Sequence, residues 1–429
     1  MRSEAPTGSA LTDSNREALA YVRACATRHR ARHLAEISRV LASARVESDV
    51  GAIIVAVRRA AAVTVNFHPD RLLADGRSVA EALYDEGVYR SQFESKISNG
   101  GLTAYPGGNR DRREESLFGG AYQAPGVKED ERPKYGGLNL MNHSDGACPR
   151  FGSCHFRLTR AALGRSTFVF GDSAADPTDI AVIDAFEPVL APLLERIALT
   201  GNALGREGLD VSSFLGGLLS TAASRGRGLF RRAPGRALDD YIETQIHGAV
   251  SLSADVEALV ADPSFRGTRT GELLLATAEL HGFPTEWHSG SALRVSEVPD
   301  DAPDNEAAAM PRWQAFCAHG RAARLARRVA EEYAVDRQHL DAAAIGQAAG
   351  SAVRHPEQWQ EWGSSTEALR CLKDLWLILV RYGTPLGDRP AEYGSGPDST
   401  RPCLPGPDPL QRGRVGAEQP LAHPRRLGL

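Results

Sequence analysis

The sequence lacks the features that mark membrane, secreted and metal-stapled proteins. A membrane-spanning helix needs about 20 consecutive apolar residues, and no apolar run approaches that length. The N-terminus, MRSEAPTGSALTDSNREAL, has no apolar signal-peptide core. The six cysteines are scattered without C-x-x-C spacing, which argues against a zinc knuckle or a disulfide framework. A net charge of −4 provides no global basic field for nucleic acid. We therefore expect a cytoplasmic protein with reduced thiols, no membrane or nucleic-acid partner, and a small-molecule or nucleotide substrate.

The composition is that of an ordinary globular protein, with 42% hydrophobic and 24% charged residues in a 429-residue chain. Helical and strand patterns alternate along it, which predicts an α+β fold with a mixed or antiparallel sheet core wrapped by N-terminal and C-terminal helices. The predicted segments are a disordered tail (1–14), a helical segment (15–62), an α/β core (63–268) with a loop insertion (200–237), a mostly helical C-terminal subdomain (269–384) and a second disordered tail (385–429).

The stretch AAVTVNFHPDRL, residues 61–72, alternates as a β-strand and then stops at a histidine. Its apolar face consists of Val63, Val65 and Phe67, and its polar face of Thr64, Asn66 and His68. Pro69 disfavours the helical region for the residue before it, so His68 is held extended. The pattern predicts that Phe67 lies in the core. His68 then faces either a cleft or a solvent-exposed sheet edge.

A second one-sided strand lies in the stretch LDDYIETQIHG. One face carries Tyr241, Glu243, Gln245 and His247, and the other Ile242, Thr244 and Ile246. A carboxylate with a glutamine two residues later indicates a ligand-facing strand. A half-solvated antiparallel strand has the same pattern, so both interpretations stay open.

Glycine pairs flank two tyrosines in the middle of the chain. SLFGGAY places Tyr122 after two glycines, and RPKYGGLNL places Tyr135 before two. Glycines let a ligand approach the backbone, and a tyrosine ring offers a stacking face. A turn-rich surface loop anchored by a tyrosine is the alternative. A dense polar group precedes them, formed by Arg90, Ser91, Gln92 and Glu94.

Neither a metal site nor a serine hydrolase is indicated. The available metal ligands are His68, Asp70, His143, Asp145 and His155. They do not have H-E-x-x-H spacing and are spread over the chain, so no metal is predicted. The G-x-S-x-G motif of a nucleophilic serine is missing.

Several long motifs occur in the order typical of one bacterial family. VTVNFHPDRLLADGRSVAEAL, GVYRSQFES, ISNGGLTAYPGGNRDR, SLFGGAY, ERPKYGGLNL, PRFGSCHF and LDDYIETQIHG together resemble domain of unknown function 3626. The resemblance covers roughly residues 15–383 and implies no established activity. The chain departs from the family pattern at Ser95-Lys96, where threonine-glycine is expected, and at Arg113, where tryptophan is expected.

A second resemblance is to the His-Tyr-Glu ADP-ribosyltransferases related to poly(ADP-ribose) polymerase. The matching positions are His68, Tyr122 and Glu243, as catalytic residues. The resemblance implies that NAD is the substrate. It further implies that histidine binds the adenosine ribose and the nicotinamide amide, tyrosine stacks on nicotinamide, and glutamate stabilises the oxocarbenium-like charge. It requires the His68 and Glu243 strands to lie side by side and open on one cleft. The expected NAD-contacting residues are Arg71, Arg90, Ser91, Gln92, Tyr135 and Gln245.

Two other functions remain open at this point. A hydrolase of a phosphorylated or nucleotide substrate, with or without a metal ion, would use a set of polar residues, namely His68, Asp70, Arg71, Arg90, Glu94 and Asp145. A non-catalytic binding or toxin-associated module would use the C-terminal helices, RAARLARRVAEEYAV among them. We expect those helices simply to cover the sheet. The oligomeric state is not specified by the sequence.

Overall fold

The computed structural model describes residues 11–96, 104–173, 177–223, 232–299, 316–317 and 320–386. Residues 1–388 form one compact unit. The first helix begins at Asp13, inside the N-terminal tail that the sequence predicts. Residues 1–10 of that tail and residues 387–429 of the predicted C-terminal tail lie outside the described residues.

An eight-stranded sheet forms the centre of the fold, in the order β10-β9-β4-β1-β3-β7-β5-β6. Its strands are β1 (Ala62–Phe67), β3 (Lys134–Asn139), β4 (Cys154–Leu158), β5 (Ser166–Phe170), β6 (Ala181–Val182), β7 (Ile242–Ile246), β9 (Val256–Ala261) and β10 (Thr285–Trp287). The β9–β10 pair is parallel and the other neighbouring strands are antiparallel. Two small sheets pair β2 (Val88–Tyr89) with β8 (Val250–Ser251) and β11 (Ala292–Arg294) with β12 (His339–Asp341). The predicted α+β fold with a mixed sheet is confirmed.

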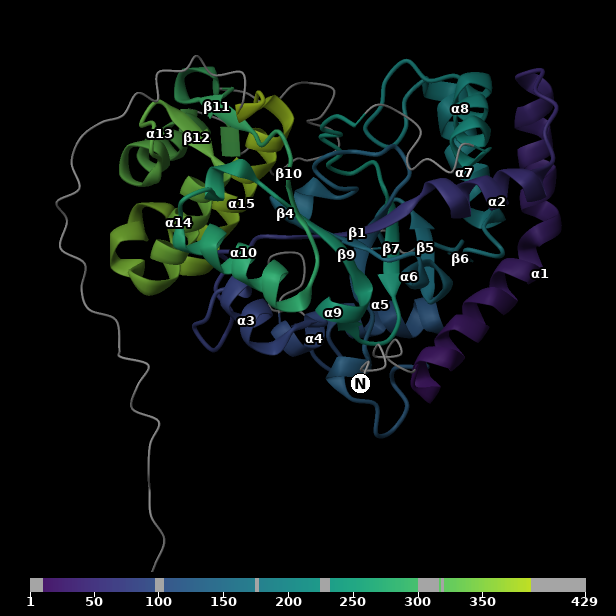
Figure 1. Cartoon of the computed structure of the whole chain (residues 1–429), viewed down its shortest axis with the longest axis horizontal. Coiled ribbons are helices and arrows are strands. Elements are labelled where there is room, and N and C mark those ends of the chain that lie inside the picture. The colour runs from purple at the N-terminus through teal and green to yellow at the C-terminus, as the bar shows by residue number, and fades with distance from the viewer. Residues whose placement is uncertain are drawn as a thin grey trace, which may run out of the picture. The chain divides into compact units, whose positions relative to one another are not determined.

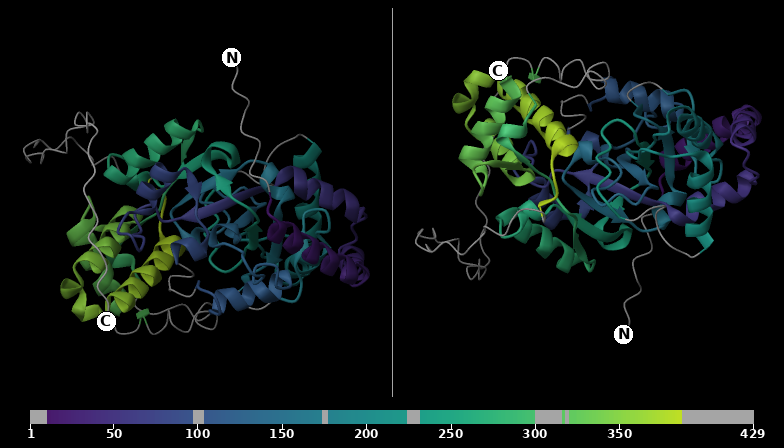
Figure 2. Two further views of the ribbon diagram at one scale, coloured as in Figure 1. Left: turned by 90° about the horizontal axis from the view of Figure 1, so that it is seen from below. Right: turned by 90° about the horizontal axis from the view of Figure 1, so that it is seen from above.

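Helices lie around this sheet (Figure 1). The N-terminal and middle helices are α1 (Asp13–Ser43), α2 (Val50–Ala60), α3 (Val79–Glu86), α4 (Gln92–Ser95), α5 (Asn109–Phe118), α6 (Ala161–Gly164), α7 (Glu187–Thr200) and α8 (Val211–Ala223). The later ones are α9 (Leu252–Asp255), α10 (Arg269–His281), α13 (Arg321–Tyr333), α14 (Ala342–Arg354) and α15 (Ser365–Tyr382). In Figure 2, α13–α15 gather at one end of the sheet, and α1, α2, α7 and α8 at the other. Among the described residues, no helix combines the length and apolarity needed to cross a membrane.

The apolar face of β1 lies in the main hydrophobic core, as its alternation predicts. Val63, Val65 and Phe67 are buried in a cluster that also contains residues of α2, α7 and α8. The Phe67 ring packs 4.8 Å from that of Phe156 on β4. The faces of β1 are therefore assigned correctly, and His68 follows on the opposite side.

Part of the predicted loop insertion, 200–237, is helical. Residues Val211–Ala223 form α8, which packs against α2. Its buried side chains are Val211, Phe214, Leu215, Leu218 and Ala222. This spacing of three to four residues is helical, but the glycines and serines between these positions obscured it.

Candidate functional site

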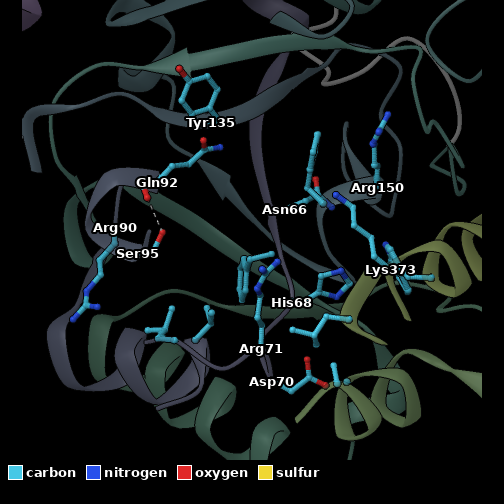
Figure 3. A pocket seen from close by; sticks show the side chains of 18 of the residues that line it. Asn66, His68, Asp70, Arg71, Arg90, Gln92, Ser95, Tyr135, Arg150 and Lys373 are labelled. Atoms are coloured by element: carbon cyan, nitrogen blue, oxygen red, sulfur yellow. Dashed lines mark hydrogen bonds between the residues drawn. The ribbon is translucent and has the colours of Figure 1, made fainter. Parts of the chain in front are cut away.

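A cavity of about 500 Å³ opens between the sheet and the C-terminal helices (Figure 3). Its walls come from the end of β1, from β3, β7, α3 and α5, and from α14 and α15. Two carboxylates line it, Asp70 and Glu243. Its cationic lining residues are Arg71, Arg90, Arg110, Arg113, Arg150, Arg370 and Lys373. This excess of positive charge suits an anionic ligand.

His68 and Glu243 line the same cavity but do not come from adjacent strands. Glu243 pairs with Gly137 of β3, and Gly137 pairs with Thr64 of β1. The expectation that the two strands lie side by side is therefore wrong, because β3 separates them. The expectation that His68 and Glu243 open on one cavity agrees with the structure, since both residues line it.

Glu243 is a carboxylate held rigidly at the cavity wall, with 4% of its surface exposed. Its Oε1 accepts from the Gln245 side-chain amide at 2.8 Å, and its Oε2 accepts from the Ser173 backbone N–H at 3.2 Å. Burial raises the pKa of Glu243, and Asp172 adds to that effect, while Arg110 and the two hydrogen bonds favour the charged form. The carboxylate is thus fixed in place with a cation nearby.

His68 is a neutral hydrogen-bonding group at the other side of the cavity. Burial, with Arg71 and Lys373 nearby, lowers the pKa of His68 to about 3. Its ring lies nearly perpendicular to that of Trp376 of α15, with 5.0 Å between the ring centroids. A neutral imidazole can both donate and accept a hydrogen bond, which suits a sugar hydroxyl or an amide.

Tyr122 does not line the cavity, in contrast to its predicted stacking role. It is 1% exposed, and its hydroxyl bonds to His247 Nδ1 at 2.6 Å and accepts from Asn15 Nδ2 at 3.1 Å. The other glycine-flanked tyrosine, Tyr135, does line the cavity. The Arg110 guanidinium lies 4.5 Å from the Tyr135 ring centroid, and the Tyr135 hydroxyl donates to Glu114 at 2.9 Å.

A chain of buried hydrogen bonds connects Tyr122 to Glu243. Tyr122 contacts His247, His247 Nε2 contacts Thr167 Oγ1 at 3.1 Å, and Thr167 donates to Gln245 Oε1 at 2.7 Å. Gln245 then donates to Glu243. Because Thr167 has only one hydroxyl hydrogen, His247 must donate to it through Nε2 and accept from Tyr122 through Nδ1. Every bond therefore points toward the carboxylate, so each strengthens the next.

The other predicted ligand contacts divide into lining and supporting residues. Arg71, Arg90 and Gln92 line the cavity. Ser91 instead caps α4 and donates to the Glu129 carbonyl, and Gln245 supports Glu243 from behind. Neither Ser91 nor Gln245 lines the cavity in the part of the chain that the structure describes.

The polar face of β1 holds a loop in place. Asn66 donates to the carbonyls of Asp145 and Gly152 at 2.9 and 3.1 Å, and Thr64 Oγ1 accepts from the Ala147 N–H at 2.9 Å. This loop carries Arg150 to the cavity. Thr64 and Asn66 are therefore buried rather than exposed on a sheet edge, and both Asn66 and His68 line the cavity.

The contribution of α15 to the cavity was not predicted from the sequence. The expectation that the C-terminal helices simply cover the sheet is incomplete, because α15 presents cavity-lining side chains at Thr366, Leu369, Arg370, Leu372, Lys373 and Trp376. Trp376 Nε1 also donates to the Pro149 carbonyl at 2.9 Å, which ties the helix to the Arg150 loop. Cations at positions 370 and 373, three residues apart on a helix with an apolar face, were the available signal.

Potential metal ligands do not converge. Within the described residues, no group of three or more His, Cys, Asp or Glu side chains has the geometry to hold a metal ion. Asp145 accepts from the N–H groups of Gly235 and Arg236 at 2.7 and 3.0 Å, and His143 Nε2 contacts the Leu204 carbonyl. These side chains organise loops.

Two of the departures from the family pattern lie at the cavity itself. Ser95 and Arg113 both line it. Lys96 has a left-handed backbone (φ 60°), a conformation that glycine adopts without strain, and its ammonium pairs with Glu129. Arg113 adds a cation where the family pattern has an aromatic ring.

Comparison with known proteins agrees with the motif order. The model of a family described as protein of unknown function (DUF3626) matches residues 62–382. No curated protein matches the chain. The match spans the sheet, the cavity and the C-terminal helices, and it begins after α1 and α2, two helices later than the sequence resemblance suggested. The chain therefore belongs to the DUF3626 family of proteins of unknown function.

Proposed function

We propose that the cavity binds a nicotinamide dinucleotide and that Glu243 promotes cleavage of its bond between ribose and nicotinamide, as in ADP-ribosyltransferases. One observation carries this proposal: a rigid buried carboxylate, Glu243, and a neutral histidine, His68, line the same cation-rich cavity.

The charge of the cavity suits such a ligand. A dinucleotide carries a negatively charged diphosphate, and the cationic lining residues supply charge-assisted hydrogen bonds for it. A cavity of about 500 Å³ falls within the usual range for small-molecule sites. Both the charge and the size therefore fit a nucleotide.

Glu243 is suited to stabilise the transition state. As the bond breaks, its electron pair leaves with neutral nicotinamide, and positive charge develops on the ribose ring. A fixed carboxylate in a water-poor site stabilises that charge without reorganising. A hydroxyl of water or of an acceptor then bonds to the ribosyl carbon and loses its proton.

Tyr135 takes the aromatic position that the sequence resemblance gave to Tyr122. Its ring lies at the cavity, and its hydroxyl bond to Glu114 fixes its position. Tyr122 supports Glu243 through the hydrogen-bond chain instead. The proposed residues are thus His68, Tyr135 and Glu243.

The test is incubation of the full chain with NAD and with NADP, each labelled in the adenosine part, while nicotinamide, labelled protein and inorganic phosphate are measured. We expect nicotinamide release, reduced about 100-fold or more in Glu243→Gln. The control is Glu257→Gln, which removes a glutamate of β9 that pairs with Arg157. Release of phosphate without nicotinamide would favour the hydrolase hypothesis, and no release of either would contradict the proposal.

A further inference from the structure

Arg71 is a cation at the cavity whose charge no described residue balances. Within the described part of the chain, its guanidinium forms no hydrogen bond or ion pair. Burial lowers the pKa of Arg71. Figure 3 shows the side chain extending into the cavity beside His68. Half-burying a guanidinium without a partner is costly unless a ligand supplies one.

The carboxylate next to Arg71 in the chain does not neutralise it. The Asp70 carboxyl packs against Gly346 of α14, where a side chain on residue 346 would overlap it. Burial, with Asp262 nearby, raises the pKa of Asp70 to about 7. Asp70 is therefore partly protonated at neutral pH and lies to one side of Arg71.

A second cation lies on the other side of His68. Lys373 of α15 also lines the cavity, and Figure 3 shows its side chain near that of His68. Its charge adds to the lowering of the His68 pKa, after burial and Arg71. Arg71, His68 and Lys373 thus surround one part of the cavity with donors. Such a group matches the oxygens of a phosphate.

The cavity has more cationic side chains than a diphosphate needs. Arg90 pairs with Glu86 and Arg150 with Asp239, whereas Arg110 lies near Glu243 and Glu114. Arg113 and Arg370 have no hydrogen bond or ion pair with a described residue. A diphosphate placed near Arg110 and Arg113 would leave the Arg71 guanidinium, which no described residue pairs with, without an anionic partner.

We propose that Arg71, His68 and Lys373 bind a phosphate monoester, so that the preferred ligand is a nicotinamide dinucleotide with a third phosphate on its adenosine ribose. This inference rests on the proposed function, which supplies the dinucleotide. The monoester carries more negative charge than either phosphate of a diphosphate, and a buried guanidinium binds it through paired hydrogen bonds. An additional phosphate contact also explains why α15 contributes cations at this point.

The experiment compares the binding of two ligands, ADP-ribose and 2′-phospho-ADP-ribose. Both lack nicotinamide, so the proposed reaction cannot consume them. Calorimetric titration of the full chain should show about tenfold or tighter binding of the phosphorylated ligand. Arg71→Gln should remove that preference. Arg58→Gln, which loses an exposed arginine paired with Asp184, is the matched control and should keep it.

Each outcome separates the two proposals. Equal affinity for both ligands, or a preference that survives in Arg71→Gln, overturns the phosphate subsite. Nicotinamide release at equal rates from NAD and NADP leaves the proposed function standing and removes the subsite. A preference that depends on Arg71, without nicotinamide release from either dinucleotide, supports the subsite and removes the proposed function. Binding of neither ligand overturns both.

Discussion

Two groups of polar side chains on one face of the sheet differ in how they are satisfied. In the paired group, Asn15, Tyr122, His247 and Thr167 bond to one another and leave no room for a ligand. In the cavity group, His68, Arg71 and Lys373 line the cavity, and the Arg71 guanidinium has no partner among the described residues. Buried polar groups that satisfy one another stabilise a fold, whereas a buried cation without a partner indicates a binding site. Gln245 connects the paired group to Glu243, which lines the same cavity as the cavity group.

The largest effect on stability should come from a change in the apolar face of β1, the strand that leads to His68. Phe67→Ala should lower the free energy of unfolding by roughly 3–5 kcal/mol, because it empties a core site beside Phe156. Urea unfolding followed by circular dichroism measures this. A loss below about 1 kcal/mol would mean that the faces of β1 are assigned the wrong way round, which would also remove His68 from the cavity.

Asp70, which lies beside the cavity group and lines the same cavity, should make stability depend on pH. The folded pKa of Asp70 is about 7, above its ordinary value, so the stability that its protonated form contributes is present at low pH and is lost as pH rises toward 7. Asp70→Asn has no proton to lose. We therefore expect the free energy of unfolding of the wild type to fall by roughly 3 kcal/mol relative to that of the variant between pH 4.5 and pH 7.5. Urea unfolding at both pH values tests this, and a constant difference would show that Asp70 titrates normally.

The two glycine-flanked tyrosines should respond in opposite ways. Tyr122→Phe removes a hydroxyl from the buried chain and should lower the free energy of unfolding by about 1–2 kcal/mol, because Asn15 and His247 lose a partner. Tyr135→Phe should cost less stability and weaken dinucleotide binding more, since its ring position depends on the bond to Glu114. Thermal melts and calorimetric titrations separate the two effects. Equal effects of both changes on binding would end the distinction between the paired and cavity groups.

Local patterns in the sequence were enough to predict the strands and their faces. Alternation placed Phe67 in the core and Glu243 on the polar face, and a proline fixed His68 in an extended conformation. The order of strands could not follow from such patterns, because pairing of β3 between β1 and β7 depends on contacts distant in sequence. Glycine spacing likewise could not distinguish Tyr122 from Tyr135. Only the fold shows that His247 takes the hydroxyl of Tyr122 while Tyr135 reaches the cavity.

The cavity-lining side chains of α15 were harder to predict from the sequence than the strand faces. Arg370, Lys373 and Trp376 lie roughly 300 residues after His68 in the sequence, on a helix whose apolar face explains its burial without any site. Their approach to His68 comes from packing of α15 against the Arg150 loop through Trp376 and Pro149. No local pattern encodes that contact.

The most direct test of the account is a crystal structure of the Glu243→Gln protein with NADP, since this variant should bind the dinucleotide without cleaving it. We predict that the nucleotide lies in the cavity between the sheet and α15, with its nicotinamide-bearing ribose beside residue 243 and its third phosphate on Arg71 and Lys373. A dinucleotide bound elsewhere on the molecule, or an empty cavity at saturating ligand, would contradict the account.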